Sequence, residues 1–312
     1  MKCSVVIRAY NEAKDIGRLF EGIKQQNLDD VEIILVDSGS TDKTVAIAKS
    51  YNAKIVHIAP REFTFGRALN YGIKAAKGEF IINVSAHCYP VYPDWLEQLL
   101  KPFEENKNLA VSYGKQRGGE TNQYSEAQFF KQYFPDISQP NQGHPYSHNA
   151  NAAIRKALWE KHPYNEALTG LEDLAWSSWA MEQGYGIAYI AEAEIIHLHD
   201  EQPAQVHNRY RREAIAMKQI LPESTFSLWN FFRLWLSSTY ADLLEAKREK
   251  VFAKNWWSIL WFRFLQYLGT YQGYHYSGRI DSQLHQGFYY PPGILSEKTP
   301  APRGVEKITY EK

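Results

Sequence analysis

Cysteine is scarce in this sequence, which contains only Cys3 and Cys88. Two such residues provide neither a disulfide framework nor a zinc-binding pattern, so we expect a reducing compartment. Long hydrophobic runs are also missing: no stretch reaches the roughly eighteen apolar residues of a membrane-spanning helix. A secretion leader is missing as well, because the chain starts directly with the apolar run 3–7, and we therefore do not expect secretion.

Neither sign of charge prevails, because 35 basic residues are matched by 35 acidic residues. The whole protein therefore has no electrostatic preference for nucleic acid or for an acidic partner. Apolar residues make up 44% of the 312 residues and charged residues 22%, a balance that supports a globular core. Aromatic residues are abundant, at 14% with nine tryptophans. The length fits one large domain, or a domain with a substantial appendage.

The first hundred residues alternate between strand-like and helix-like segments. The expected strands cover residues 3–8, 31–37, 54–58 and 79–85, and the expected helices cover 12–26, 41–51 and 66–76. The strands lack polar alternation and are separated by amphipathic helices, which predicts an α/β fold with a doubly wound, mostly parallel sheet covered on both faces. Ligands of such sheets bind beyond the carboxyl ends of the strands, where Arg8, Asp37 and Ser85 stand.

The rest of the chain divides by composition. Residues 115–147 are rich in Gly, Gln, Asn and Pro, which predicts a loop-heavy insertion over the rim of the sheet. Helices are then expected at 152–161 and 172–183, followed by strands at 186–190 and 193–199. From Pro203 onward, long helices contain five of the nine tryptophans. We therefore expect a nucleotide-binding and catalytic domain at 1–205, a helical aromatic-rich region at 206–295 and a loosely ordered tail at 296–312.

The segment VDSGSTDKT follows the second expected strand and places Asp37 at its end. A carboxylate there, followed by a tight turn that starts with Ser38, suits recognition of a nucleoside base or of ribose hydroxyls. The next helix begins near Thr41 and directs its N-terminus toward an anion. The alternative is that Ser40 or Thr41 only caps that helix and that Asp37 only ends a strand.

Together with RAYNE (8–12), this segment resembles the family 2 glycosyltransferases, which have the GT-A fold. The matching blocks are VVIRAYNEAKDIGRLFEGI, EIILVDSGSTDKTVAIAKSY, FGRALNYGIKAAKGEFIINVSAHCYP, NANAAIRKALWEKHPYNEALTGLEDLAWSSWAMEQGY and AEIIHLH. They cover about the first two-thirds of the chain in the family's own order, and several linked blocks are more specific than any one of them. The resemblance is greatest to the bacterial rhamnosyltransferase-like branch, which builds surface polysaccharides.

This resemblance implies a binding site for a nucleotide-sugar donor. The residues that would contact the donor are Ala9, Tyr10, Glu12, Asp37, Ser38, Arg67, Ser85 and His87. Arg67, with Asn70 nearby, would lie near the phosphates or the sugar, because a departing phosphate needs a fixed cation. The alternative for Arg67 and Asn70 is a solvated helix face.

The resemblance also implies that the acidic pair Glu172-Asp173 includes the catalytic base. An inverting transfer requires a carboxylate that accepts the proton of the acceptor hydroxyl as its oxygen attacks the anomeric carbon. We predict that Asp173 is this base and that Glu172 positions or tunes it. Alternatively, both acids only favour a helix N-terminus, where they interact well with the helix dipole.

The family's metal-binding turn usually contains two carboxylates, but this sequence has Ser85-Ala86-His87 there. Three interpretations compete. A divalent cation, Mn or Mg, is still bound by His87 together with His197 or His199 of AEIIHLH, with imidazole favouring Mn. Alternatively, no metal binds and His87, Arg67 and Arg8 stabilise the leaving group. In the third, the donor is a CMP-sugar with no diphosphate to bridge. We prefer a metal held by His87 and His199.

Two further regions suggest contacts with an acceptor or a surface. His148 and Asn149, with His144, precede the block NANAAIRKALW and would contact the acceptor, unless they belong to a solvent-exposed loop. In the C-terminal third, the spacing of Trp229, Phe232, Leu236 and Tyr240 gives an apolar helical stripe. Aromatic and basic residues suit a membrane interface, but the helices could equally pack on the first domain or form a homo-oligomer interface.

The sequence therefore predicts an inverting glycosyltransferase that moves a sugar from a nucleotide-sugar donor to a hydroxyl of a glycan or lipid-linked acceptor. Its expected setting is bacterial surface polysaccharide or capsule synthesis at the cytoplasmic face of the cell membrane. One alternative class is a catalytically silent sugar-nucleotide-binding scaffold, which the altered turn favours and the intact acidic pair opposes. A nucleotidyltransferase ranks last, because it predicts a Gly-rich loop after the first strand and no glycine occurs there until Gly17.

Overall fold

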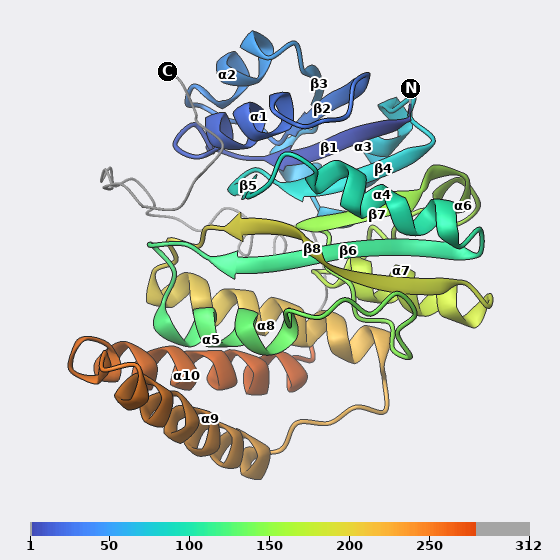
Figure 1. Cartoon of the computed structure of the whole chain (residues 1–312). Coiled ribbons are helices and arrows are strands. Elements are labelled where there is room, and N and C mark those ends of the chain that lie inside the picture. The colour runs from blue at the N-terminus through green and yellow to red at the C-terminus, as the bar shows by residue number, and fades with distance from the viewer. Residues whose placement is uncertain (1, 279–312) are drawn as a thin grey trace.

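A computed structural model describes residues 2–278, and its central feature is an eight-stranded sheet. The strand order is β3-β2-β1-β4-β7-β6-β8-β5 (Figure 1). The strands are β1 (Cys3–Ala9), β2 (Val31–Asp37), β3 (Lys54–His57), β4 (Phe80–Ser85), β5 (Cys88–Pro90), β6 (Leu109–Gly118), β7 (Asn151–Arg155) and β8 (Gly186–His197). The helices are α1 (Ile16–Lys24), α2 (Thr44–Ser50), α3 (Phe65–Ala75), α4 (Trp95–Glu105), α5 (Tyr124–Tyr133), α6 (Lys156–Lys161), α7 (Glu172–Glu182), α8 (Pro203–Ile220), α9 (Leu228–Arg248) and α10 (Phe252–Tyr274).

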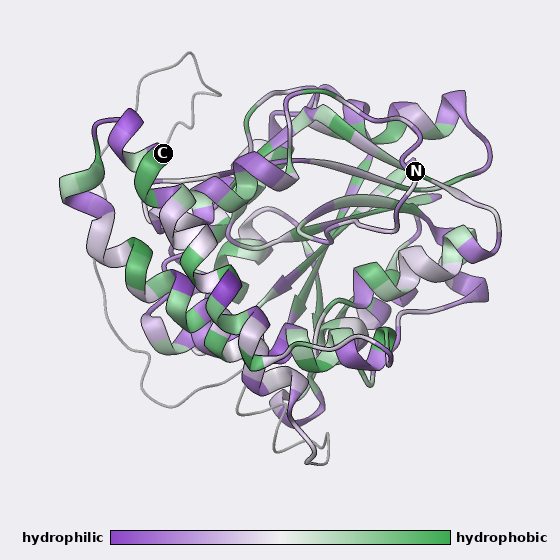
Figure 2. Cartoon of the chain, turned by 90° about the horizontal axis from the view of Figure 1, so that it is seen from below, coloured by the Kyte–Doolittle hydropathy of each residue, from purple (hydrophilic) through white to green (hydrophobic). Residues whose placement is uncertain are grey.

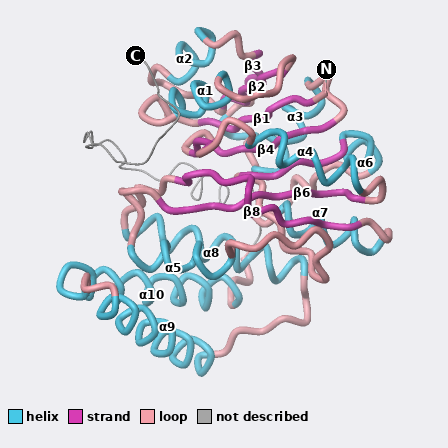
Figure 3. Tube along the Cα trace, in the orientation of Figure 1, coloured by secondary structure: helices cyan, strands magenta, loops and turns pink. Residues whose placement is uncertain are grey.

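Helices cover both faces of the sheet, as the sequence predicts. Alternate side chains of a strand point to opposite faces, so Val5 of β1 joins one core and its neighbour Val6 joins the other. The first core contains the apolar sides of α1 and α4, and the second contains those of α3, α6 and α7. The two layers of helices on either side of the strands are visible in Figure 3.

The predicted parallel order of the first four strands is confirmed, since β3, β2, β1 and β4 pair in parallel. The strand boundaries agree to within one residue, but α1 and α2 begin three to four residues later than the expected helices at 12–26 and 41–51. The reason is local: the backbone amide of Glu12 donates to the Thr44 hydroxyl, and the amides of Ala13 and Thr44 both donate to the Asp42 carboxylate. These contacts hold both segments as loops.

Two expectations for the middle of the chain are wrong, and a third is incomplete. Residues 115–147 lie mostly outside helices and strands, as expected, but they also contain the end of β6 and all of α5. The expected helix at 152–161 is a strand, β7, followed by the short helix α6, because β7 pairs antiparallel with both β4 and β6. The two strands expected at 186–190 and 193–199 form one strand, β8, whose pairing with β6 shifts register after Ile190.

Beyond Pro203 the chain is helical, and α8, α9 and α10 lie beyond β8 at the bottom of Figure 1. Gly269 and Gly273 let α10 approach α8 closely, because a Cβ atom at either position would lie 2.4 Å from a backbone oxygen of α8. None of the helices between residues 2 and 278 combines the length and apolar character that crossing a bilayer requires. The expected tail at 296–312 lies outside the described residues.

A buried ion pair joins the C-terminal helices to one another and to the sheet domain. Arg263 of α10 donates from Nε and Nη2 to the Asp242 carboxylate of α9, at 2.7 and 3.0 Å. Its Nη2 also donates to the backbone carbonyl of Ser125 in α5, at 3.3 Å. Both charged side chains are under 10% exposed. The charge that interrupts the apolar run of α10 therefore has a packing function inside the protein.

We predict that Asp242→Leu lowers the free energy of unfolding by about 3 kcal/mol, because it leaves the buried Arg263 charge without its carboxylate. The double variant Asp242→Leu/Arg263→Met should recover most of the loss, since both charges are then replaced by apolar groups. Urea unfolding followed by tryptophan fluorescence measures both values. A single variant as stable as the parent protein would contradict this account of the ion pair.

Candidate active site at the strand ends

The carboxyl ends of β1, β2 and β4 lie side by side in the sheet. Ala9 of β1 is in register with Asp37 of β2, and Arg8 is in register with Ser85 of β4. The prediction that Arg8, Asp37 and Ser85 stand at neighbouring strand ends is therefore confirmed. This edge of the sheet brings together side chains from distant parts of the sequence.

Asp37 is held by the turn that follows it. Its carboxylate is 3% exposed and accepts hydrogen bonds from the backbone amides of Gly39 and Ser40, at 3.3 and 3.1 Å. Nδ1 of His57 lies 3.3 Å from the same carboxylate. Ser38 is buried, and its hydroxyl donates to the Ala9 carbonyl at 3.3 Å. A carboxylate has about four acceptor positions, so these contacts fix Asp37 without using all its capacity.

The loops after β1 and β2 are tied together beside Asp37. Asn11 adopts a left-handed conformation with φ of 55°, and its side-chain oxygen accepts from the Thr41 amide at 2.8 Å. The Asn11 amide donates in turn to the Ser40 hydroxyl at 3.0 Å. Tyr10 stands next to this junction with 38% of its surface exposed. The strand-end loops thus form a braced rim with an aromatic side chain at the surface.

Arg8 connects this rim to the acidic pair. Its Nη1 lies 3.2 Å from Oε1 of Glu172, the first residue of α7, and its guanidinium stacks on Phe65 with 4.5 Å to the ring centroid. Burial raises the pKa of Glu172, an effect that Arg8 opposes and the charge of Asp173 adds to. Burial also raises the pKa of Asp173. Two adjacent carboxyls are therefore held in a low-dielectric setting beside one guanidinium.

Asn149 fixes the position of Asp173. Its backbone amide donates to Oδ2 of Asp173 at 2.9 Å, and its side-chain amide reaches Oε1 of Glu172 at 3.4 Å. The Asn149 side-chain oxygen accepts from Asn83 of β4 and from the Tyr164 hydroxyl, each at 3.1 Å. Asn149 is buried, so the exposed-loop alternative is wrong for this residue. Its predicted contact with an acceptor stays a prediction.

The backbone is strained where the acidic pair begins. Leu171 precedes Glu172 and adopts a left-handed conformation with φ of 56°. A non-glycine residue in this conformation costs free energy, and such residues cluster at functional sites. The turn orients α7 so that its first two side chains face Arg8 and Asn149.

Three histidines meet next to the strand ends. His87, His197 and His199 each offer one ring nitrogen, and these nitrogens all lie within 4.8 Å of one another. Nε2 of His197 is 3.0 Å from Nε2 of His199, and the His87 ring stacks on His197 with centroids 5.1 Å apart. The segments meet because β5 pairs with β8, with Cys88 in register with His197. His148 also joins the cluster, with its ring centroid 6.0 Å from that of His197.

The other ring nitrogen of each histidine faces an oxygen of a polar side chain. Nδ1 of His87 lies 2.9 Å from Glu12, Nδ1 of His197 lies 2.7 Å from Gln116, and Nδ1 of His199 lies 2.5 Å from Glu126. Arg209 of α8 in turn holds Glu126 at 2.6 Å. A fixed partner on one ring nitrogen is typical of histidines that bind a metal through the other nitrogen.

Charge is distributed unevenly over the histidine cluster. Burial alone would lower the pKa of His87, but the neighbouring Glu12 carboxylate outweighs burial and the pKa is raised. The pKa of His197 is lowered well below its usual value, first by burial and then by His199. Burial and His199 lower the pKa of His148 to about 4. His197 and His148 are therefore neutral near pH 7, the form in which imidazole binds a metal.

Two predicted donor contacts on α3 are engaged within the protein. Arg67 Nε lies 2.7 Å from Oε2 of Glu166, and Arg67 also donates to the Glu62 carbonyl at 2.8 Å. Asn70 donates to Tyr164 and Glu166 and is 8% exposed, so the alternative of a solvated helix face is wrong for Asn70. Glu12, predicted to contact the nucleoside, is paired with His87.

Gln116, Glu126 and Arg209 surround the histidine cluster but were not foreseen in the sequence. Gln116 and Glu126 fall in the segment expected to be a loop, and Arg209 falls in the helical extension. No motif links these three positions to AEIIHLH, so only their contacts in space identify them.

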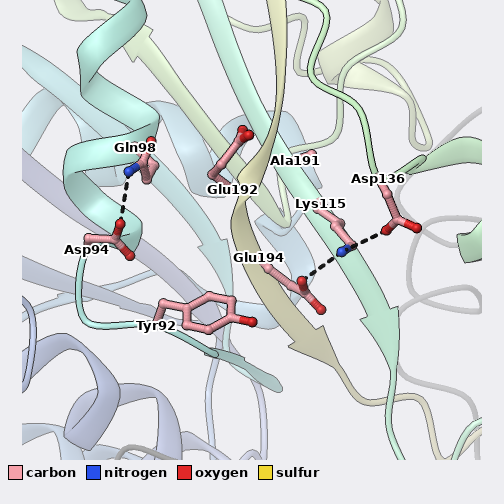
Figure 4. Close-up of a pocket in the computed structure, with 8 residues that line it drawn as sticks. All are labelled: Tyr92, Asp94, Gln98, Lys115, Asp136, Ala191, Glu192 and Glu194. Atoms are coloured by element: carbon pink, nitrogen blue, oxygen red, sulfur yellow. Dashed lines mark hydrogen bonds and ion pairs between the residues drawn. The ribbon is translucent and has the colours of Figure 1, made fainter.

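A separate cavity of about 360 Å³ lies along β6 and β8 (Figure 4). It is lined by Tyr92, Asp94, Gln98, Lys115, Asp136, Ala191, Glu192 and Glu194. Lys115 lies 2.9 Å from Asp136 and 2.8 Å from Glu194, so it is paired with two of the acidic side chains that line the cavity. None of the predicted site residues lines it, and the strand ends remain the candidate site.

Solved structures with the same architecture include glycosyltransferases. TarS of Staphylococcus aureus in complex with UDP-GlcNAc has a TM-score of 0.52 at 19% sequence identity, over 83% of this chain and 90% of that one. The mannosyltransferase PcManGT of Pyrobaculum calidifontis, in complex with GDP-Man and Mn²⁺, has a TM-score of 0.59 at 16% identity, over 94% and 88%. These likenesses show that the sheet and its helices form a GT-A fold, as expected.

Residues 4–162 match the model of glycosyl transferase family 2, and the chain belongs to this family. It is 28% identical over 203 residues to the O-antigen chain rhamnosyltransferase WbaN of Salmonella anatum, covering 61% of this chain and 64% of that relative. It is 26% identical over 222 residues to the O-antigen chain rhamnosyltransferase RfbN of Salmonella typhimurium, covering 67% and 70%. The predicted family is confirmed.

We predict that the two acids and Arg8 affect stability in opposite directions. Arg8→Met should lower the free energy of unfolding at pH 7 by about 2 kcal/mol, because the guanidinium then no longer offsets the burial of the two carboxylates. Glu172→Gln and Asp173→Asn should not lower it at neutral pH. A carboxyl with a raised pKa in the folded state reduces stability as pH rises through that pKa, so removing its charge removes this cost. Thermal unfolding at pH 7 measures all three variants, and a large loss in either acid variant would contradict this account.

Proposed function

We propose that the protein transfers a sugar from a nucleotide-sugar donor to a hydroxyl group of an acceptor, with inversion at the anomeric carbon. The observation that carries this proposal is the position of Arg8. It lies one residue before Ala9, which pairs with Asp37, and it contacts Glu172 across the edge of the sheet. A molecule bound at the strand ends therefore lies beside the acidic pair.

The nucleotide is proposed to bind at the rim formed by the loops after β1 and β2. Asp37 is buried and braced by its own turn, so a hydrogen bond from a base or ribose donor would meet a fixed acceptor. Tyr10 adds an exposed ring, and Ser38 and Ala9 form the floor. Support comes from the related folds of TarS, solved with UDP-GlcNAc, and PcManGT, solved with GDP-Man.

Asp173 is proposed to act as the general base. Its carboxylate accepts the proton of the acceptor hydroxyl while that oxygen forms a bond to the anomeric carbon. The bond from this carbon to the phosphate oxygen breaks, and the nucleoside phosphate leaves with the electron pair. The Asn149 and Leu174 amides hold the Asp173 oxygens in place. Glu172 is proposed to tune this base, and Arg8 keeps the acidic pair from repelling the anionic donor.

The histidine cluster fits a divalent cation by the chemistry of its donor set. His87, His197 and His199 present nitrogens close to one another, and each has a fixed partner on its other nitrogen. Imidazole ligands favour Mn²⁺ over Mg²⁺. A cation there would supply positive charge for a nucleoside diphosphate leaving group. We propose that these three residues hold it, with His197 added to the predicted pair.

The acceptor is proposed to belong to bacterial surface glycan synthesis. The support is the similarity to two O-antigen chain rhamnosyltransferases, together with His148 and Asn149 beside the acidic pair. The sugar, the linkage and the acceptor are set by the pocket and not by the fold. A donor screen by thermal shift, with uridine, guanosine, thymidine and cytidine sugar nucleotides, identifies the nucleotide. Stabilisation by a CMP-sugar alone would favour the alternative donor without a diphosphate.

Asp173→Asn is expected to reduce transfer by at least about a thousandfold while donor affinity stays within about twofold. Because the pKa of Asp173 is raised, kcat/KM of the parent protein should rise with pH through a value above the usual aspartate range. Product formation with the donor found in the screen, and calorimetric donor binding, measure these effects. Substantial transfer by Asp173→Asn would remove the assignment. Donor binding without turnover in the parent protein would favour the silent scaffold.

Dialysis against a chelator is expected to abolish transfer, and adding Mn²⁺ back should restore it. His197→Ala should weaken Mn²⁺ binding by at least about tenfold, because it removes a ligand that is held neutral. Calorimetry or the electron paramagnetic resonance of free Mn²⁺ measures binding independently of turnover. His57→Ala is the matched control, since His57 lies outside the cluster. Undiminished transfer after dialysis would contradict the metal proposal.

A further inference from the structure

Large apolar side chains are exposed along one side of α9 and continue onto α10. Trp229 is 73% exposed, Leu236 60% and Tyr240 65% on α9, and Trp257 is 63% exposed on α10. The three on α9 are separated by seven and four residues, so they share one side of the helix. The predicted stripe on this helix therefore exists, and the structure places it on the outside of the protein.

The exposed residues of the two helices form one surface. The Trp235 ring of α9 contacts the Phe264 ring of α10, with centroids 5.4 Å apart, and Phe264 lies two turns from Trp257. We name this surface the α9–α10 face; it comprises Trp229, Leu236, Tyr240, Leu244, Trp257 and Phe264. Figure 2, a view from below Figure 1, shows hydrophobic and hydrophilic stretches alternating along the helices at this end of the molecule.

Acidic side chains are few in the region of this face, and each has a basic partner. Between residues 226 and 276 the chain has six basic and only three acidic residues. Asp242 is buried against Arg263, Glu249 is paired with Lys131, and Glu245 is paired with Arg248. Helix α10 contains no acidic residue at all.

Basic side chains without such partners border the same face. Arg233, Lys247, Lys250 and Lys254 have no ion pair with any residue in the part of the chain that the structure describes. All four are exposed. Because the whole chain has no net charge, this local excess of positive charge is a property of the α9–α10 region and not of the protein at large.

We propose that the α9–α10 face binds the surface of a phospholipid bilayer that contains anionic lipids. Exposed tryptophan, tyrosine and leucine between lysine and arginine side chains is the chemistry of a helix that lies in the headgroup region. The inner sides of α9 and α10 are occupied by protein, through Arg263 and its partners. Only the outer side chains are therefore available to enter the lipid.

A second copy of this chain is a weaker candidate for the same face. A twofold interface places equal surfaces against each other, so the four unpaired basic residues of one copy would face those of the other. An anionic lipid surface has the complementary charge. The electrostatics therefore favour lipid over self-association.

In Figure 1 the turn between α9 and α10 lies toward the same end of the strands as the candidate site, but β1, β2 and β4 lie at the top of the view and α9 lies at the bottom. Lys247 lies in the last turn of α9 and Lys250 in the turn that follows it, and in Figure 1 this turn lies at the left, the side toward which β6 and β8 run. The strand ends that carry the candidate site lie on that side as well. The inference uses none of the site residues, so it stands or falls independently of the proposed transfer reaction.

The test is sedimentation of the full chain with vesicles of phosphatidylcholine, with and without phosphatidylglycerol. We expect binding to the vesicles that contain phosphatidylglycerol, weakened by salt, and much weaker binding to phosphatidylcholine alone. The variant Trp229→Ser/Leu236→Ser/Tyr240→Ser should reduce partitioning by at least about tenfold. Reversal of charge in Arg233→Glu/Lys247→Glu should reduce it comparably, and only for the anionic vesicles.

Control variants test whether vesicle binding depends on this surface, or only on the number of exposed apolar side chains and on the net charge of the protein. Tyr71→Ser/Ile137→Ser removes exposed apolar side chains elsewhere, and Lys24→Glu/Lys49→Glu makes the same charge change on α1 and α2. Both should bind vesicles like the parent protein, and circular dichroism and thermal unfolding confirm that each variant is folded.

Two results would overturn the proposal. One is an absence of binding to anionic vesicles at low salt by the parent protein. The other is equal loss of binding in the control variants. Light scattering after size exclusion tests whether a second copy of the chain covers the face instead. A parent protein that is dimeric and binds no vesicles, with a triple serine variant that is monomeric, would assign the face to a second copy.

Discussion

The ion pair between Arg8 and Glu172 joins residues that lie 164 positions apart in the chain. It places the end of β1 against the first turn of α7, and so it decides whether the two halves of the candidate site face each other. The guanidinium also offsets part of the repulsion between two neighbouring carboxyls that are both buried. Asn149 and the strained turn at Leu171 hold α7 in the same orientation as this ion pair.

The first half of the fold could be predicted well because its strands are continuous apolar runs. The range 31–37 was predicted to the residue, since VEIILVD is bounded by Asp30 on one side and a turn on the other. The segment Asn151–Arg155 was misassigned because alanine favours a helix, whereas pairing with β4 and β6 imposes a strand. Helix α5 was missed because polar residues surround it, and its order comes from packing against the C-terminal helices.

The candidate site was predictable where a motif lies at a strand end, and not where it depends on contacts between distant segments. Asp37, the acidic pair and His87 all follow an apolar run or begin a helix, and each is visible in the sequence. The inclusion of His197 depends on the pairing of β5 with β8, which no local pattern reveals. Glu126 and Arg209 are an extreme case, since their importance comes only from the side chains that they touch.

The contact from Arg209 through Glu126 to His199 starts in the helical extension and ends among the histidines. A fragment cut after Asp200 would keep every histidine of the cluster and the acidic pair, yet it would lose Arg209, whose guanidinium holds Glu126. The appendage is therefore part of the wall of the candidate site. These helices are therefore not a modular tail. Exchanging them between relatives would disturb the histidine cluster as well as the outer surface of the protein.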